Sequence, residues 1–135
     1  MRVLITKTMN LEHIETYSDR IPNEWVQFNP TINTYILQHL YFDTNDKKLK
    51  PTEPWSGAIG FDYVKFLVGI GDKPQDGVIT EQLTAILIHR QEEFNKIRPS
   101  EQGTKIVEHL KEVVRLTEER IEDRKNRGVH GENKL

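Results

Sequence analysis

The chain has 135 residues, which is enough for one domain with a modest hydrophobic core. Its formal net charge of −2 argues against a general affinity for nucleic acid or for an anionic membrane surface. It contains no cysteine, which excludes disulfide bonds, a thiol nucleophile and thiolate metal ligands. No apolar run approaches the ~20 residues of a transmembrane helix, so we expect a soluble protein of the cytoplasm.

The N-terminal half of the chain, residues 1–74, has the pattern of β-structure. The strand candidates are residues 2–8, 24–28, 33–43 and 60–70. Residues 33–43 form the strongest candidate because they are dense in β-branched and aromatic side chains. Residues 60–70 are also long enough for a short helix, and residues 44–48 form a polar turn. The N-terminus is short and alternates, which is typical of a strand rather than of a signal peptide.

The C-terminal half, residues 75–135, has the pattern of a two-helix hairpin followed by a tail. The helix candidates are about residues 81–96 and 101–126. Thr80 is a candidate N-cap for the first helix. Pro99 disfavours helix at the residue before it, and Ser100 then caps the second helix. Gly128 suits the position just past the end of that helix.

The two halves together predict an α+β fold, in which an N-terminal antiparallel β-sheet is followed by a C-terminal two-helix hairpin. We expect a single domain over residues 1–135, with its β-rich part at 1–74 and the hairpin and tail at 75–135. The sequence contains no internal repeat and no low-complexity segment.

The apolar face of the second helix turns cationic near its end. At about 100° per residue, Ile106, Leu110, Val113 and Thr117 form one stripe, which predicts that they face the core. The same stripe continues into Arg120 and Arg124. Two interpretations remain open. The arginines interact favourably with the helix macrodipole while their stems cover apolar surface. Alternatively, their guanidinium groups form a fork for a phosphate, with Asp123 orienting an arginine or receiving a ribose hydroxyl.

Phe94, near the end of the first helix, is either a core aromatic or a platform on which a base stacks. In an antiparallel hairpin Leu83 lies near Leu116. Phe94 then lies roughly 25 Å from Arg120 and Arg124, at 1.5 Å per residue. These residues therefore cannot share a ligand within one chain. Two antiparallel hairpins in a twofold dimer would bring them together in two identical pockets.

No pattern in the sequence indicates catalysis or a metal site. The five histidines show no ligand spacing such as H-E-x-x-H. The G-x-S-x-G, Walker A and G-x-G-x-x-G motifs are also absent from the sequence. We therefore expect no catalytic residue, no bound metal and no cofactor.

Several strings in the second half are similar to those of a known family. They are residues 76–83, 88–94, 109–112, 119–124 and 127–131, and the most specific is R-x-x-D-R followed by R-G-V-x-G. This region resembles the helical-hairpin domain of phage anti-defence proteins that act against the Thoeris system and, in related members, against CBASS. The resemblance covers roughly residues 75–131. The β-rich half matches only by its size and layout.

The resemblance implies a protein of the bacterial host cytoplasm that is not an enzyme but binds and sequesters cyclic signalling nucleotides. The implied ligands are chiefly cyclic ADP-ribose isomers made by bacterial TIR proteins, and some members also hold cyclic di- or trinucleotides at separate sites. It also implies a homodimer, often assembled into a hexamer, with pockets between chains and no DNA, RNA or membrane partner. By position, Arg120 and Arg124 match the phosphate-binding arginines and Phe94 matches the base-stacking aromatic. With Asp123, these residues form the expected ligand-binding set.

The chain departs from the family pattern at the start of the second helix. Family members often carry C-R-E-N there, and this chain has Ser100, Glu101, Gln102 and Gly103. The asparagine that commonly contacts the ligand is thus replaced by glycine.

Candidates for N-terminal residues that close the pocket are Arg20, Tyr35, Trp55 and Lys65. Two rival functions stay open: an enzyme that degrades the same signal, and a hairpin that binds a protein partner and no small molecule.

Overall fold

The computed structural model of the protein describes residues 11–52, 60–68 and 75–128. The chain divides into two compact units, Met1–Lys65 and Phe66–Leu135. The first unit is built from antiparallel strands and the second contains two helices. The predicted α+β class, with an N-terminal antiparallel sheet before a C-terminal helical hairpin, is therefore confirmed.

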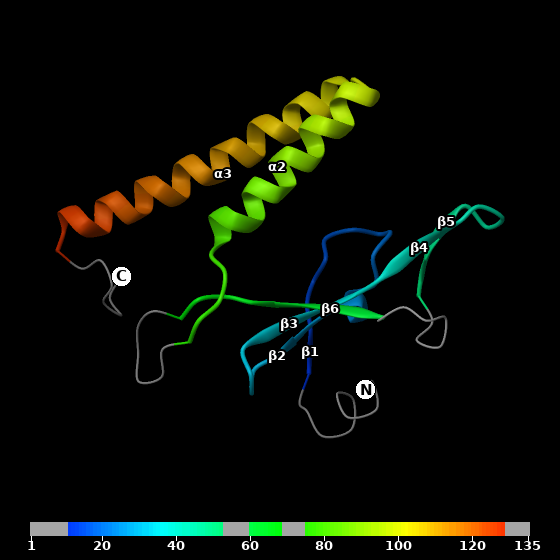
Figure 1. Ribbon diagram of the computed structural model, residues 1–135, viewed down its shortest axis with the longest axis horizontal. Coiled ribbons are helices and arrows are strands. Elements are labelled where there is room, and N and C mark those ends of the chain that lie inside the picture. Colours follow the sequence, from blue (N-terminus) through cyan, green and yellow to red (C-terminus); the bar gives the residue numbers. More distant parts are fainter. Residues whose placement is uncertain (1–10, 53–59, 69–74, 129–135) are drawn as a thin grey trace. The chain divides into compact units, whose positions relative to one another are not determined.

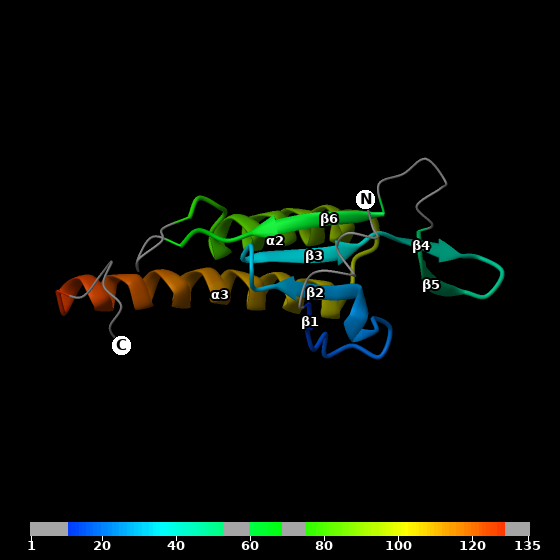
Figure 2. The ribbon, with the colours of Figure 1, turned by 90° about the horizontal axis from the view of Figure 1, so that it is seen from below.

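The main sheet of the first unit has four antiparallel strands in the order β1-β2-β3-β6. The strands are β1 (Glu12–His13), β2 (Val26–Asn29), β3 (Thr34–Gln38) and β6 (Phe61–Lys65). Figure 2 shows β2, β3 and β6 side by side. Ile36 lies at the centre of β3, opposite Gln27 and Tyr63, and is only 4% exposed. Its β-branched side chain therefore forms the buried core of the sheet.

A second, two-stranded sheet consists of β4 (Leu40–Asp43) and β5 (Lys48–Pro51). The prediction of one strand over residues 33–43 was therefore wrong, because β3 and β4 belong to different sheets. His39 separates them: its N–H donates to the carbonyl of Gly60, and its own carbonyl accepts from the N–H of Thr52, both at 2.9 Å. These long-range bonds leave His39 outside the ladder of either sheet. The predicted polar turn lies between β4 and β5.

The remaining strand candidates have mixed outcomes. The segment predicted as a strand over residues 24–28 begins instead as a 3₁₀ turn, Asn23–Trp25, and becomes extended only in β2. The alternative of a helix within residues 60–70 is decided in favour of strand β6. The candidate over residues 2–8 lies outside the described residues.

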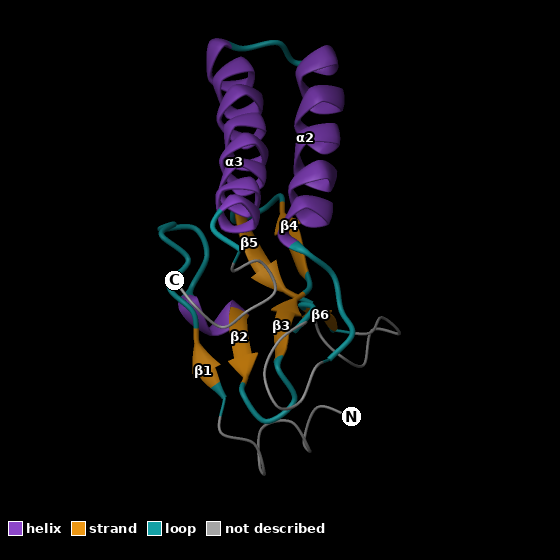
Figure 3. Cartoon of the chain, turned by 90° about the vertical axis from the view of Figure 1, so that its left-hand side faces the viewer, coloured by secondary structure: helices purple, strands orange, loops and turns teal. Residues whose placement is uncertain are grey.

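The second unit contains the hairpin of α2 (Thr80–Ile97) and α3 (Glu101–Asn126). Figures 1 and 3 show the two helices side by side, joined at one end, and Figure 1 shows α3 extending beyond the start of α2. Before α2 the chain is tied by backbone hydrogen bonds. The N–H of Leu67 donates to the carbonyl of Val78, and Val68 and Gln75 exchange two bonds, all at 2.8 Å.

The helix starts differ in how they are capped. The N-cap of α2 is Ile79, one residue before the predicted Thr80, and it offers no side-chain acceptor. Instead, Gln82 reaches back and its Oε1 accepts from the N–H of Ile79 at 2.9 Å. The predicted cap of α3 is confirmed, because Ser100 Oγ accepts from the N–H of Gly103 at 2.9 Å.

The end of α3 also follows the prediction. Gly128 has a φ of 72°, which is the left-handed conformation that glycine adopts without strain. Its N–H donates to the carbonyl of Lys125 at 3.0 Å. The glycine therefore ends the helix by turning the backbone at the position just past the C-cap.

The least exposed side chains of the hairpin recur at every third or fourth position. They include Thr84, Ile88, Gln91 and Asn95 on α2, and Gly103, Val107, Leu110, Val114, Thr117, Ile121 and Arg124 on α3. This spacing is typical of the seam between two packed helices. Two contacts cross the seam: Asn95 Nδ2 donates to Thr104 Oγ1 at 3.4 Å, and Lys111 Nζ lies 3.4 Å from a carboxylate oxygen of Glu92.

Candidate functional site

Part of the apolar stripe predicted to face the core is exposed in the single chain. The exposed apolar residues of the two helices are Ile86, Leu87, Phe94 and Ile97 on α2 and Ile106, Val113 and Leu116 on α3, each 40–80% accessible, from 42% for Ile106 and Val113 to 78% for Ile97. We call this set the hairpin apolar face. The prediction that Ile106 and Val113 face the core was therefore wrong. Small and polar residues such as Thr84 and Gly103 take seam positions, which a search for hydrophobic periodicity does not find.

Phe94 lies in the last turn of α2, and 53% of it is exposed. The packing of α2 against α3 therefore does not bury this aromatic residue. An exposed ring next to other apolar side chains is suited to stacking with a flat group of a ligand or with a partner chain.

The cationic end of α3 contains all three of the other predicted site residues. Arg120 and Asp123 are exposed, and Arg124 is half-buried. Asp123 Oδ2 accepts from Arg127 Nε at 3.1 Å. The sequence suggested that Asp123 orients Arg120 or Arg124, and the structure adds Arg127 as a partner of this carboxylate. The end of α3 and its C-cap thus carry the guanidinium groups of Arg120, Arg124 and Arg127, with the carboxylate of Asp123 paired to Arg127.

The antiparallel pairing keeps Phe94 away from this cationic end. Because Asn95 contacts Thr104 across the seam, Phe94 lies at about the level of the first turns of α3. Arg120 is 16 residues beyond Thr104 on α3, which places it about 24 Å from that level at 1.5 Å per residue. The structure therefore keeps the aromatic and the arginines apart within one chain. This separation is the one that the sequence predicted.

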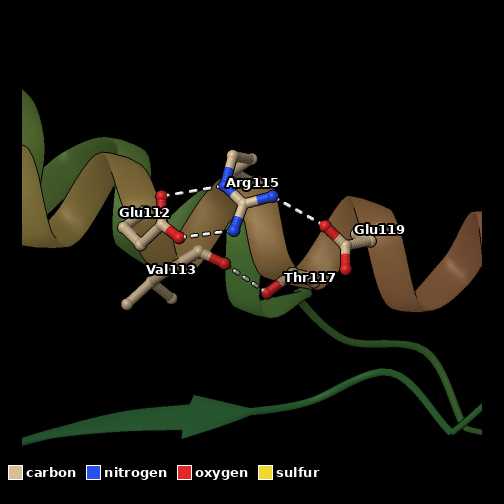
Figure 4. Close-up of polar contacts among 5 residues, drawn as sticks. All are labelled: Glu112, Val113, Arg115, Thr117 and Glu119. Carbon is tan, nitrogen blue, oxygen red and sulfur yellow. Dashed lines mark hydrogen bonds and ion pairs between the residues drawn. The ribbon is translucent and has the colours of Figure 1, made fainter.

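Arg115, the next arginine towards the N-terminus of α3, is held by its own helix (Figure 4). Its Nε donates to Glu112 at 2.8 Å, and its Nη1 donates to Glu119 at 2.6 Å. These carboxylates raise the pKa of Arg115, and the guanidinium lowers the pKa of Glu112 through the hydrogen bond. Since its donors point to carboxylates on the same helix, Arg115 is a natural control for Arg120 and Arg124.

Gly103 lies in the first turn of α3, beside the side chain of Asn95. Asn95 Oδ1 accepts from the N–H of Ser100 at 3.1 Å, and its Nδ2 bonds Thr104. A Cβ atom added to Gly103 would lie 2.5 Å from Asn95 Oδ1 and 3.0 Å from Ser100 Oγ. A glycine is therefore required here as long as Asn95 keeps its position.

The described parts of the chain contain neither a candidate metal site nor a candidate membrane-spanning helix. Within residues 11–52, 60–68 and 75–128, no three histidine, aspartate or glutamate side chains are grouped so that they could hold a metal ion. No helix in these segments is both long enough and apolar enough to cross a membrane. The chain matches no protein-family model and no curated protein sequence.

Proposed function

We propose that this protein is a phage anti-defence protein that binds and sequesters cyclic nucleotide immune signals in the bacterial host cytoplasm without degrading them. The observation that carries the proposal is the placement of Phe94 and the arginine pair. An exposed aromatic lies near one end of the hairpin, and Arg120 and Arg124 lie near the other. The similarity of residues 75–131 to the hairpin of Thoeris inhibitors supports the same function.

The chemistry of these side chains suits a cyclic ADP-ribose isomer. Guanidinium groups donate paired, charge-assisted hydrogen bonds to phosphate oxygens, which are roughly twice as strong as neutral ones. The ring of Phe94 offers a surface for a purine, and Asp123 can accept from a ribose hydroxyl. Cyclic di- and trinucleotides of CBASS carry the same two groups, a base and a phosphate, so they belong to the same proposed ligand class.

A second copy of the chain completes the pocket in this proposal. In an antiparallel, twofold pair of hairpins, Phe94 of one chain approaches Arg120 and Arg124 of the other, and symmetry creates two identical pockets. The hairpin apolar face supports the pairing, since exposed apolar surface of this kind marks interaction sites. We therefore propose a homodimer as the binding unit, with a hexamer as the larger assembly that the resemblance implies.

The proposal assigns no chemistry to the pocket. Sequestration needs affinity and a stoichiometric amount of protein, whereas hydrolysis would need a nucleophile, a metal or a positioned base. No cofactor, DNA, RNA or membrane partner is part of the proposal. The asparagine common in the family is Gly103 in this chain, and the side chain of Asn95 lies beside it. Both ends of the Asn95 amide are hydrogen-bonded at the start of α3, to Ser100 and Thr104.

The test is a thermal-shift panel of cyclic ADP-ribose isomers and cyclic di- and trinucleotides. A ligand at 100 times its Kd adds about 2.7 kcal/mol to the free energy of unfolding, which corresponds to several degrees in Tm. We expect one ligand to raise Tm, the Arg120→Ala/Arg124→Ala variant to lose the shift, and Arg115→Ala to retain it. Recovery of intact ligand after heat denaturation would separate sequestration from degradation. If no cyclic nucleotide raises Tm, the proposal is wrong.

The hairpin apolar face also favours a second function, a protein–protein interaction module without a small-molecule ligand. In that case the arginines would pair with acidic groups of a partner across an interface. Charge reversal by Arg124→Glu would then abolish partner binding, and no nucleotide would raise Tm. The same panel therefore discriminates between the two functions.

A further inference from the structure

The first unit contains a cavity of about 520 Å³ that is separate from the hairpin residues described above. Its lining comes from two segments, residues 19–25 and the β4–β5 hairpin. The lining residues are Asp19, Arg20, Pro22, Trp25, Phe42, Lys47, Lys48 and Leu49. All of them belong to the unit Met1–Lys65. The volume lies within the range of small-molecule sites, which are typically about 300–1,000 Å³.

The apolar part of the cavity includes two aromatic residues, Trp25 and Phe42. Phe42 in β4 and Leu49 in β5 are paired directly across the two strands, so their side chains share one face of that sheet. Phe42 is 57% exposed, which is unusual for an aromatic residue that has no ligand or partner. Trp25 is half-buried at the end of the 3₁₀ turn, where its N–H donates to the carbonyl of Pro22 at 3.0 Å. These residues offer flat apolar surface to a ring.

The polar part of the cavity carries three cations and one carboxylate, that of Asp19. Arg20, Lys47 and Lys48 are exposed, and no ion pair joins their side chains to another residue of the described segments. The cavity therefore has a net positive lining of +2, from three cations and one anion. Such a positively charged lining attracts an anionic ligand.

The acids of the nearby turn do not neutralise these cations through direct contact. Both carboxylates form ion pairs with Lys50 instead: Lys50 Nζ lies 2.8 Å from Asp43 Oδ2 and also pairs with Asp46. The two carboxylates raise the pKa of Lys50, and Lys50 lowers the pKa of each carboxyl group. Lys48 acts on Asp46 only as a weaker, more distant charge. Lys47 and Lys48 therefore keep their donors available to the cavity.

We propose that this cavity is a binding site for a small organic anion that carries a planar ring, of the size of a nucleoside monophosphate. The ring lies against Trp25 and Phe42, and the phosphate lies between Arg20, Lys47 and Lys48. Asp19 is positioned to accept from a hydroxyl or amino group of the same ligand. The structure places Arg20, one of the candidates for closing the hairpin pocket, in this cavity instead. The cavity contains none of Phe94, Arg120, Asp123 and Arg124, so this site is independent of the proposed function of the hairpin.

Tryptophan fluorescence gives a direct test. The chain has two tryptophans, Trp25 and Trp55, so Trp55→Phe leaves Trp25 as the only reporter. We expect AMP, GMP, CMP or UMP to quench this fluorescence with saturation, and we expect adenosine or inorganic phosphate alone to bind at least tenfold more weakly. Quenching should weaken as the salt concentration rises.

Charge variants of the same protein complete the test. Arg20→Ala and the pair Lys47→Asn/Lys48→Gln should each weaken binding tenfold or more, and the control Lys105→Gln, on α3 of the second unit, should leave it unchanged. Asparagine suits position 47 because its φ is 56°, in the left-handed region. Unchanged far-UV circular dichroism verifies the fold. The absence of saturable quenching by all four nucleotides, or equal binding by the charge variants, would overturn the proposal. Binding that persists in Arg120→Ala/Arg124→Ala separates this site from the hairpin.

Discussion

Asn95 Oδ1 occupies the space beside Gly103 that a side chain at position 103 would need, since an added Cβ would lie only 2.5 Å from it. The same oxygen accepts from the N–H of Ser100, so Asn95 joins the end of α2 to the start of α3. Two residues eight positions apart thus determine the geometry of the loop between the helices. A glycine in a helix is normally unfavourable by about 1 kcal/mol relative to alanine. The close approach of Asn95 explains why a glycine stands at position 103.

We predict that Gly103→Ala changes the free energy of unfolding with a sign that depends on residue 95. In the natural sequence the methyl group displaces Asn95, and the lost hydrogen bonds and crowding exceed the gain in helix propensity. The net loss should be about 1 kcal/mol. In an Asn95→Ala background the same substitution should stabilise by up to about 1 kcal/mol. Urea denaturation of the natural protein, the two single variants and the double variant measures this cycle. If Gly103→Ala changes the free energy of unfolding with the same sign in both backgrounds, the predicted contact is contradicted.

The N-cap of α3 gives a second prediction. Ser100→Ala removes the acceptor for the N–H of Gly103 and should lower the free energy of unfolding by about 1 kcal/mol. Ser100→Asp restores an acceptor and adds a negative charge near the helix N-terminus, so it should be close to the natural protein. Thermal denaturation monitored at 222 nm compares the three proteins. Equal losses for alanine and aspartate would show that the cap has no such role.

The β4–β5 turn should loosen at acidic pH. The hydrogen bond from Lys50 lowers the pKa of Asp43 to about 2, compared with about 3.9 in an unfolded chain. A lowered pKa means that this carboxylate stabilises the folded turn fully above about pH 4, and that the stabilisation is lost as the pH falls towards 2. The amides of Asn45 and Asp46 report the change by NMR, since both donate to Asp43 Oδ1.

The matched control for the acid titration is Lys50→Gln, which removes the positive charge and keeps a polar side chain. In this variant the midpoint of the amide shifts should rise towards the ordinary pKa of an aspartate. High salt should also raise the midpoint in the natural protein, because the ion pair is accessible to solvent and salt screens it. If the midpoint is the same with and without Lys50, another group is responsible for the low pKa.

A shared pocket can be tested by complementation between two inactive variants. Phe94→Ala and Arg120→Ala/Arg124→Ala should each abolish nucleotide binding. A heterodimer of the two retains one intact pocket, made from Phe94 of one chain and the arginines of the other. After unfolding and refolding of an equal mixture, about one quarter of the natural number of sites should return, because half of the dimers are mixed and each has one of two pockets. Isothermal titration calorimetry counts the sites, and no recovery would exclude a pocket between chains.

The hairpin apolar face should determine self-association. Ile86→Lys places a charge on this face and should convert the assembly to monomers while the helical content stays unchanged. The control Glu122→Lys introduces the same side chain at another exposed position of the hairpin and should leave the assembly intact. Light scattering coupled to size-exclusion chromatography measures the mass of each variant. A natural protein that is already monomeric at high concentration would contradict the dimer.

Local sequence signals determined the hairpin and both ends of α3. Ser100 and Gly128 were predicted as the cap and the end of α3, and both make the expected backbone contacts. These features depend on residues within one helical turn, so the sequence contains the necessary information. The separation of Phe94 from Arg120 also followed from the sequence, since helix lengths and an antiparallel turn fix it.

Tertiary structure alone decided where the strand over residues 33–43 is interrupted and which helix faces meet. His39 leaves the ladder because it bonds Gly60 and Thr52, which lie far from it along the chain. The seam uses Thr84 and Gly103, whose small size allows close packing but gives no hydrophobic signal. The cavity around Trp25 and Phe42 likewise combines segments that no local pattern connects. Long-range hydrogen bonds and packing determine these features because they depend on contacts between distant parts of the chain.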